Sequence, residues 1–326
     1  MQTEMIKRAK ELLADGTVKR VAGWRSGDFQ YELSPSIFTD AEDLEKNFQY
    51  SELAASNMSK YMIKESRKEG KVLIFLKPCD TYSFQQLLNE HRILRENVMI
   101  IGVACDGNLD IVAAKKRFGE GLLSLKSEGD TITATTIYGE ELTAPRQELL
   151  LERCVNCKSK KHVVFDELIG EEGVEVETTH RFDKVDELDA MSEDQRFGFW
   201  QNELSRCIRC NACRDICPAC SCENCVFDNP ESGFSNKGAA VQMDNDMFHI
   251  IRAFHVAGRC TDCGECSRVC PEHIPLHLLN RKFIKDYDGL YGEFQAGSGE
   301  QETHPLTKFN MEDLNPTEAL NRGDEE

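Results

Sequence analysis

The chain has 326 residues, of which 40% are hydrophobic and 29% are charged, and its formal net charge is −18. This length is sufficient for about two domains with separate hydrophobic cores. The excess of acidic residues disfavours direct binding to nucleic acids, because phosphate contacts need clustered Lys and Arg. No apolar run approaches the roughly 18 residues of a membrane-spanning helix, and the first residues resemble an amphipathic helix rather than a signal peptide. We therefore expect a cytoplasmic protein that does not insert into membranes.

The first half of the chain contains the elements of an α/β domain. Residues 5–13 have the spacing of an amphipathic helix. Two continuous apolar runs, residues 71–76 and 97–104, flank a segment with helical spacing at residues 81–91. Because both runs are apolar throughout, this order predicts a parallel βαβ unit whose strands are buried on both faces.

The remaining chain divides by composition. Residues 131–138 alternate between apolar and polar side chains, and we expect them to form an edge strand. Residues 166–190 are acidic and resemble a loop, so the domain boundary is placed there. The predicted organisation is an α/β domain over residues 1–185, a mostly α-helical ferredoxin-like domain over 190–292 and an acidic C-terminal tail over 293–326.

The sequence contains 15 cysteines, a large and odd number for an intracellular chain. A disulfide framework would require an oxidising compartment and paired cysteines, and no secretion signal is recognisable. Ligation of metals or of iron–sulfur clusters explains the number of cysteines better. The spacing of the cysteines decides between these kinds of site.

Two runs in the second half have the ligand spacing of bacterial ferredoxins, Cys-x2-Cys-x2-Cys-x3-Cys-Pro. The runs begin at Cys207 and Cys260. In such runs the first three cysteines bind one cluster and the fourth reaches the other cluster. Zinc sites use two Cys-x2-Cys pairs instead, so two [4Fe–4S] clusters are predicted. The ligands predicted for cluster A are Cys207, Cys210, Cys213 and Cys270. The ligands predicted for cluster B are Cys260, Cys263, Cys266 and Cys217.

A helix is predicted between the two runs, at residues 239–257. Its apolar side chains fall on one side: Val241, Met247, Ile250, Ile251 and Phe254. With the two runs, this helix resembles the α-helical ferredoxin domain of fumarate reductase iron–sulfur subunits and of the small heterodisulfide reductase subunit. Cysteines already satisfy both clusters, so we expect structural or surface roles for His249 and His255.

Four cysteines in the first half form a second group. Cys79 follows the first apolar strand and Cys105 follows the second. The ends of parallel strands meet at one edge of a sheet, so these thiols are expected to be neighbours. With Cys154 and Cys157 they supply four ligands, which suits either a cubane or a zinc ion. The alternative is four unrelated buried thiols, since free cysteine is common in protein cores.

The order Pro78-Cys79, Gly102-x2-Cys105 and Cys154-x2-Cys157 is similar to the β-subunit family of deazaflavin-reducing hydrogenases and formate dehydrogenases. The similarity covers roughly residues 70–165. It implies a third [4Fe–4S] cluster bound by these four cysteines beside a flavin, FAD. Two features depart from the family: the ferredoxin runs follow this domain instead of preceding it, and no glycine-rich phosphate loop is recognisable. The resemblance therefore favours the third cluster more than the FAD.

Three further cysteines, Cys220, Cys222 and Cys225, follow the first ferredoxin run directly. They suit a fourth cluster or a zinc ion, completed by an outside ligand such as Asp228, a histidine or a group from a partner. A redox-sensing or structural set is the alternative.

Together these features predict an electron-transfer subunit of a cytosolic anaerobic oxidoreductase complex. The sequence has many one-electron sites and no visible acid–base or nucleophile constellation, so no catalytic residue is predicted. The expected partners are other redox subunits: a formate dehydrogenase or hydrogenase catalytic subunit, or a heterodisulfide-reductase-like flavoprotein, docked through the acidic surface. One alternative is a flavin-containing subunit that exchanges hydride with NAD(P)H or deazaflavin. The other is a zinc-dependent scaffold.

Overall fold

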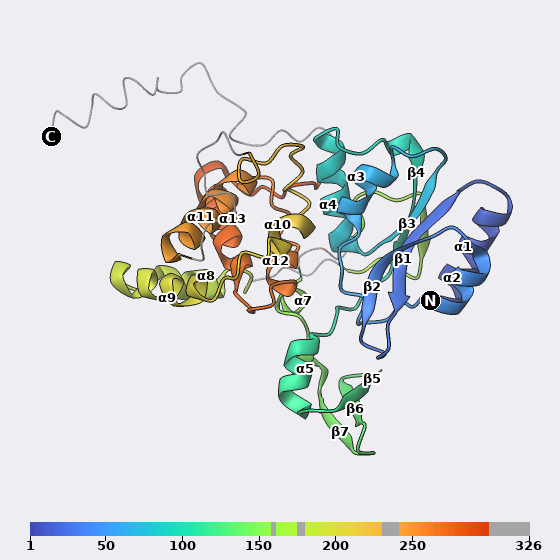
Figure 1. Ribbon diagram of the computed structural model, residues 1–326, viewed down its shortest axis with the longest axis horizontal. Coiled ribbons are helices and arrows are strands. Elements are labelled where there is room, and N and C mark those ends of the chain that lie inside the picture. The colour runs from blue at the N-terminus through green and yellow to red at the C-terminus, as the bar shows by residue number, and fades with distance from the viewer. Residues whose placement is uncertain (158–160, 175–179, 230–240, 300–326) are drawn as a thin grey trace.

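A computed structural model describes residues 1–157, 161–174, 180–229 and 241–299. An α/β part lies beside a helical part, and a small sheet with one helix projects from their junction (Figure 1). No helix in these ranges is long and apolar enough to cross a membrane. The predicted fold class, an α/β domain followed by a helical cysteine-rich region, is confirmed.

The α/β part is built on one mixed sheet with the strand order β2-β1-β3-β4-β8. All neighbouring pairs are parallel except β1 and β2, which are antiparallel at one edge. Every residue of β3 is buried, and all of β4 except Met99, as fully apolar central strands require. The strands are β1 (Arg20–Ser26), β2 (Leu33–Phe38), β3 (Val72–Leu76), β4 (Val98–Val103) and β8 (Glu167–Ile169).

Helices cover this sheet, and α4 connects β3 to β4, which confirms the predicted βαβ unit. Pro78 begins α4, where its missing N–H costs no hydrogen bond. The helix lies between the sheet and the helical part (Figure 1). The helices here are α1 (Gln2–Ala14), α2 (Ala41–Asn47), η1 (Ser59–Tyr61), α3 (Met62–Glu65), α4 (Pro78–Asn89) and η2 (Arg95–Asn97).

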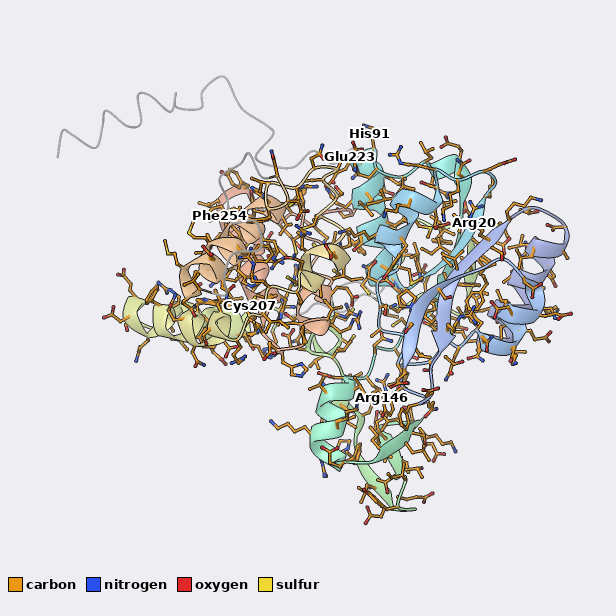
Figure 2. The ribbon with its side chains drawn as sticks, viewed as in Figure 1. Arg20, His91, Arg146, Cys207, Glu223 and Phe254 are labelled. Atoms are coloured by element: carbon orange, nitrogen blue, oxygen red, sulfur yellow. The ribbon has the colours of Figure 1, made fainter. Side chains whose placement is uncertain are left out.

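A second, antiparallel sheet has the order β5-β6-β7. Residues 131–138 were expected to form an edge strand, and this is wrong because β6 is the central strand of that sheet. Its alternating residues Ile132 and Ala134 pack in a small separate core with Phe118. Arg146 lies beside this projecting sheet (Figure 2). The elements are α5 (Ile111–Phe118), β5 (Leu122–Glu128), β6 (Thr131–Thr136), β7 (Glu141–Pro145) and α6 (Arg146–Leu149).

The expectation of a loop over residues 166–190 is also wrong, because this segment contains β8 and the helix α8 (Asp183–Asp189). The acidic character that suggested a loop has another cause. Glu167 accepts two hydrogen bonds from the Arg8 guanidinium, at 2.6 and 2.8 Å. An acidic residue in a short edge strand thus serves as an ion-pair partner for the neighbouring helix.

The helical part begins with α9, which Ser192 starts through a capping box with Gln195. The short helices α10 and α12 each carry the third cysteine of a ferredoxin run, and the longer α11 and α13 pack against one another. The bounds are α7 (Glu152–Val155), α9 (Glu193–Ser205), α10 (Ala212–Ile216), α11 (Gln242–Val256), α12 (Glu265–Arg268) and α13 (Leu276–Tyr291).

The helix predicted between the runs is α11, and several of its apolar side chains are exposed. Phe254 is 62% exposed and Met247 is 38% exposed, and Phe254 lies on the helical part away from the sheet (Figure 2). The residues turned inward are instead Asn245, Phe248, His249, Arg252, Ala253 and Val256. The inner face combines polar residues with Phe248, Ala253 and Val256, and Phe248 and Val256 pack against cysteines.

Buried polar contacts join the two parts. The hydroxyls of Ser83 and Thr261 lie 2.8 Å apart, and the Glu265 carboxylate accepts the Asn57 backbone N–H at 3.1 Å. Beyond α13 the chain returns to the α/β part, where Ala296 is buried and the Asn89 side chain donates to the Gly299 carbonyl at 3.0 Å. Residues 300–326 of the expected acidic tail lie outside the described residues.

Candidate iron–sulfur sites

The two ferredoxin runs share one local backbone design. The residues on either side of the second cysteine have positive φ in both runs: Arg209 and Asn211 at 56° and 63°, Asp262 and Gly264 at 58° and 65°. These left-handed residues reverse the chain so that successive cysteines point the same way. Such a conformation is uncommon outside glycine, and its repetition marks both loops as matched ligand loops.

The four cysteines predicted for cluster A line one small cavity with Phe248 and His249: Cys207, Cys210, Cys213 and Cys270. Cys210 is exposed, whereas Cys213 and Cys270 are buried. The His249 Nε2 atom lies 3.2 Å from the Cys207 Sγ atom. Burial and the nearby Arg252 and Arg209 lower the pKa of His249 to about 3, so its ring is neutral at physiological pH. This agrees with a structural role for His249.

The cysteines predicted for cluster B also converge, although Cys217 comes from the other run. Burial raises the pKa of Cys260 and Cys263, and the charge of Cys217 raises both further. The same two effects, against an opposing one from Arg252, raise the pKa of Cys266 to about 11. Such thiols are protonated at neutral pH in the free protein, so binding iron would release protons.

The cysteines of the first half come together at the edge of the main sheet. Cys79, Cys154 and Cys157 line a small cavity, and Cys263 of the cluster B set lines the same cavity. Burial raises the pKa of Cys105 to about 11, with contributions from Cys154 and Cys157, which places the fourth thiol nearby. The front set and the cluster B set are therefore immediate neighbours.

Sequence reasoning missed the charged group that joins these two sets. Arg153 forms a buried ion pair with Glu265 at 2.8 Å, and its guanidinium also donates to the backbone carbonyls of Ala55 and Cys263. Burial alone would raise the pKa of Glu265, but Arg268 and Arg153 lower it to about 2. The only sequence signal was an arginine directly before the Cys-x2-Cys pair, since its partner lies 112 positions away.

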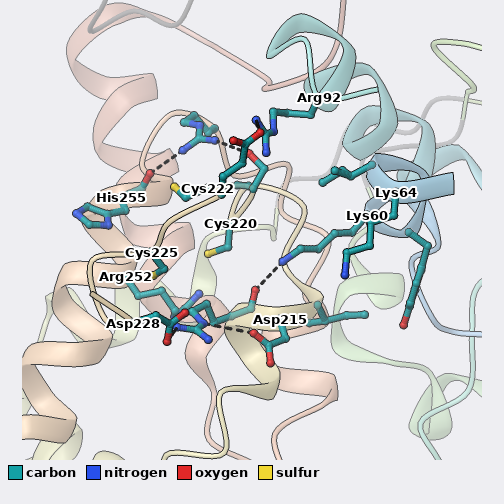
Figure 3. Close-up of a pocket in the computed structure, with 18 of the residues that line it drawn as sticks. Lys60, Lys64, Arg92, Asp215, Cys220, Cys222, Cys225, Asp228, Arg252 and His255 are labelled. Atoms are coloured by element: carbon teal, nitrogen blue, oxygen red, sulfur yellow. Dashed lines mark hydrogen bonds and ion pairs between the residues drawn. The ribbon is translucent and has the colours of Figure 1, made fainter. Parts of the chain in front are cut away.

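Cys220, Cys222 and Cys225 line a larger cavity of about 620 Å³ between the two parts. Figure 3 shows these cysteines and His255 on one side of the cavity and Lys60 and Lys64 on the other. Glu223 lies at the same boundary, close to His91 (Figure 2). Asp228, expected as an outside ligand, also lines this cavity but pairs with Arg214 at 2.9 Å.

The spacing of the side chains within these cysteine sets bears on what they could hold. In the described part of the chain, no three His, Cys, Asp or Glu side chains are close enough to hold one metal ion. A cubane holds its thiolates further apart than one ion does, because each thiolate binds a different iron. Cysteine sets whose thiols face one cavity but are too far apart to hold one ion are therefore compatible with iron–sulfur clusters.

Comparison with known families defines the class of protein. Residues 203–274 match the 4Fe–4S dicluster domain family, which implies at least two [4Fe–4S] clusters. The chain is thus an iron–sulfur protein with a dicluster domain at the helical part.

Two individual proteins are similar to this chain over most of its length. The chain is 23% identical over 338 residues to the F420-dependent formate dehydrogenase subunit beta of Methanocaldococcus jannaschii, covering 86% of this chain and 88% of the relative. It is 25% identical over 310 residues to the F420-dependent formate dehydrogenase 1 subunit beta of Methanococcus maripaludis, covering 76% and 78%. F420 is a deazaflavin, so the resemblance found in the sequence is confirmed.

A solved structure of the xenon-derivatised F420-reducing [NiFe] hydrogenase complex from Methanosarcina barkeri contains a chain similar to this one. The TM-score is 0.38 and the sequence identity is 12%. The similarity covers 57% of this chain and 72% of the other.

Proposed function

We propose that this chain is the electron-transfer subunit of a cytoplasmic complex of the F420-dependent formate dehydrogenase or hydrogenase type. The observation that carries this proposal is the contiguity of three cysteine sets. Cys213 of the cluster A set affects the pKa of Arg252 together with Cys266 of the cluster B set, so the two sets share a neighbour. Cys263 of the cluster B set lines the cavity of the front set. Clusters A, B and the front cluster then form one chain of electron carriers.

The ends of this chain of carriers differ in exposure. Cys210 of the cluster A set is exposed, whereas Cys79 and Cys105 of the front set are partly covered at the end of the parallel strands. Electrons would therefore exchange with a docked partner beside cluster A and with a second redox group at the sheet edge. The catalytic subunit of a formate dehydrogenase or hydrogenase, or a heterodisulfide-reductase-like flavoprotein, is the proposed partner.

Cys220, Cys222 and Cys225 are proposed as a further iron–sulfur site in the cavity between the two parts. His255 is the better fourth ligand, because it lines the same cavity while Asp228 is held by Arg214. The hydrogen bond from the Cys220 thiol lowers the pKa of Cys217 to about 6, so this site would adjoin cluster B.

The iron, zinc and flavin content per chain, measured on protein purified without oxygen, tests these assignments. About eight irons would restrict the function to clusters A and B, and about twelve would support the front cluster as well. About sixteen would add the site at Cys220, Cys222 and Cys225. Fewer than about eight irons, or zinc in their place, would contradict the electron-transfer function.

A flavin-containing subunit is the second candidate, and the cavity between the two parts favours it. Its volume of about 620 Å³ lies in the range of cofactor sites. Lys60, Lys64 and Arg67 line it and would attract the pyrophosphate of FAD. Yellow absorbance released on denaturation would establish a bound flavin. Colourless supernatant after denaturation of fully iron-loaded protein would exclude it.

A further inference from the structure

Arg252 on α11 is a buried cation without a partner. Its side chain is 1% exposed. None of its three guanidinium nitrogens has a hydrogen-bond partner among the described residues. The buried Arg153 and Arg281 differ, because each forms an ion pair with a glutamate at 2.8 Å.

Cysteines surround Arg252. Burial lowers its pKa, but the charge that four cysteines carry when deprotonated raises the pKa above the ordinary value. In decreasing order of effect these are Cys266, Cys213, Cys217 and Cys220. Cys213 belongs to the cluster A set, whereas Cys266 and Cys217 belong to the cluster B set. Arg252 and Cys220 also line the cavity shown in Figure 3.

A charge in this position needs compensation. Burying an ion without a partner costs several kcal/mol, and a guanidinium cannot escape the cost by losing its proton. A cubane held by four thiolates is negatively charged, and its sulfurs accept hydrogen bonds. The unpaired guanidinium nitrogens of Arg252 therefore fit a position beside two bound clusters. Cluster sulfur would there accept the hydrogen bonds that a carboxylate accepts from other buried arginines.

We propose that Arg252 donates hydrogen bonds to the sulfurs of clusters A and B and raises the reduction potential of both. This inference rests on the proposed binding of clusters A and B. Reduction adds one electron to a cluster, so a fixed positive charge stabilises the reduced form more than the oxidised form. Net charge and hydrogen bonds to sulfur are the two properties through which a protein sets cluster potentials.

One cation shared by two clusters has a further consequence. It shifts both potentials in the same direction, so the difference between them changes little. Arg252 therefore raises the potentials of both clusters relative to those of outside donors and acceptors without adding a step in free energy between A and B. Arg252 is thus a positioning residue of the electron path and not a ligand.

The test compares Arg252→Gln with Arg252→Lys in the full chain purified without oxygen, with cluster potentials measured by EPR-monitored redox titration. Arg252→Gln removes the charge, and we expect the reduction equilibrium of both clusters to fall at least tenfold, about 59 mV for a one-electron couple. Arg252→Lys keeps the charge and should lie closer to wild type. Arg206→Gln is the matched control, because Arg206 is exposed, pairs with Glu203 at 2.6 Å and also lies beside cluster A.

Two outcomes would overturn the proposal. One is an Arg252→Gln chain with full iron content and wild-type potentials. The other is a shift in Arg206→Gln as large as that in Arg252→Gln, which would indicate a general effect of net charge. Iron content separates these results from failure of the proposed function, in which the wild-type chain itself would contain no clusters.

A measurement on the wild-type backbone covers the case in which Arg252→Gln does not fold. In protein labelled with 15N at the guanidinium nitrogens of arginine alone, pulsed EPR of the reduced clusters should detect coupling to those nitrogens. This coupling should be weaker in Arg252→Lys, in which the Arg153 guanidinium remains beside Cys263. Equal coupling in the wild-type chain and in Arg252→Lys, or none in the wild-type chain, would overturn the proposal.

Discussion

The α/β part and the helical part each contain an almost completely buried cation, and these two cations differ in their partners. In the α/β part, the fully buried Lys77 pairs with Asp80 at 2.8 Å and donates to the carbonyls of Ala54 and Ser56. In the helical part, the buried Arg252 has no partner among the described residues, and neither has the Nδ1 atom of His249. The buried Lys77 is paired within the polypeptide, whereas Arg252 needs a group that the described residues do not supply.

Removal of iron should give the largest effect, because it should unfold one part and leave the other folded. Because metal binding and folding are coupled where buried ligands and charges depend on the metal, chelation under mild oxidation should unfold the helical part. Hydrogen exchange should then show lost protection in α9–α13 and retained protection in β3 and β4. Simultaneous loss of protection in both parts would show that the α/β part also depends on its cluster.

The second largest effect is expected from Cys217→Ser. Cys217 belongs to the first run, yet its thiol lies among the cysteines of the cluster B set. The variant should perturb the EPR signal of cluster B and leave cluster A as the better preserved signal. Cys210→Ser is the matched control, since it should perturb cluster A instead. Equal loss of cluster A in both variants would contradict the interleaved assignment.

A smaller effect is expected from Cys79→Ser, because the front set lies at the edge of a sheet whose central strands are buried among apolar side chains. The iron content should fall by about four per chain, with the signals of clusters A and B retained. The reason is that Cys79 lines the front cavity and is not among the ligands predicted for clusters A and B. Unchanged iron content would show that the front cysteines bind no cluster.

The smallest effect is expected from Glu90→Gln, which weakens a contact between the parts. The Arg259 guanidinium donates two hydrogen bonds to the Glu90 carboxylate, at 2.6 and 2.8 Å. Loss of this pair should lower the free energy of unfolding by about 1.5–3 kcal/mol, as measured by denaturant titration. Lys10→Gln is the control, because its pair with Glu45 is exposed and should contribute less than about 1 kcal/mol.

The pair of Glu90 and Arg259 also predicts how the stability of the protein changes with pH. Burial raises the pKa of Glu90, but Arg259 and other hydrogen-bond donors lower it below the ordinary 4.5. The contribution of Glu90 to stability is therefore complete above pH 4.5 and is lost as the pH falls through the lower value of the folded state. Glu90→Gln should remove this part of the acid sensitivity, and an unchanged acid transition would contradict it.

The elements that the sequence predicted correctly are those whose structure follows from a pattern within the element itself. β3 and β4 are continuous apolar runs buried on both faces, so their pairing and the position of α4 could be predicted. β6 was recognised as a strand from its alternation, but its neighbours could not be predicted, because register depends on the turns and on a separate core. β8 has three residues, too few for a periodic signal.

The candidate sites show the same limit. The spacing within each ferredoxin run is local and predicts a ligand set for each cluster, and the cysteines predicted for cluster A line one cavity. The contacts between sites are not local: Arg153 meets Glu265 across 112 positions, and α11 turns Arg252 inward against its apolar periodicity. Sequence therefore predicted the cysteine sets and missed the charged residues between them.

The position of β8 in the chain bears on how the protein is made. β8 pairs with β4 at the sheet edge, yet it follows Cys154 and Cys157 in the sequence. Since synthesis proceeds from the N-terminus and domains fold as their chains emerge, the main sheet is completed only after all four front cysteines have left the ribosome. The cavity that Cys79, Cys154 and Cys157 line is also lined by Thr261, Asp262 and Cys263. These thiols can therefore be covered only after synthesis has passed residue 263.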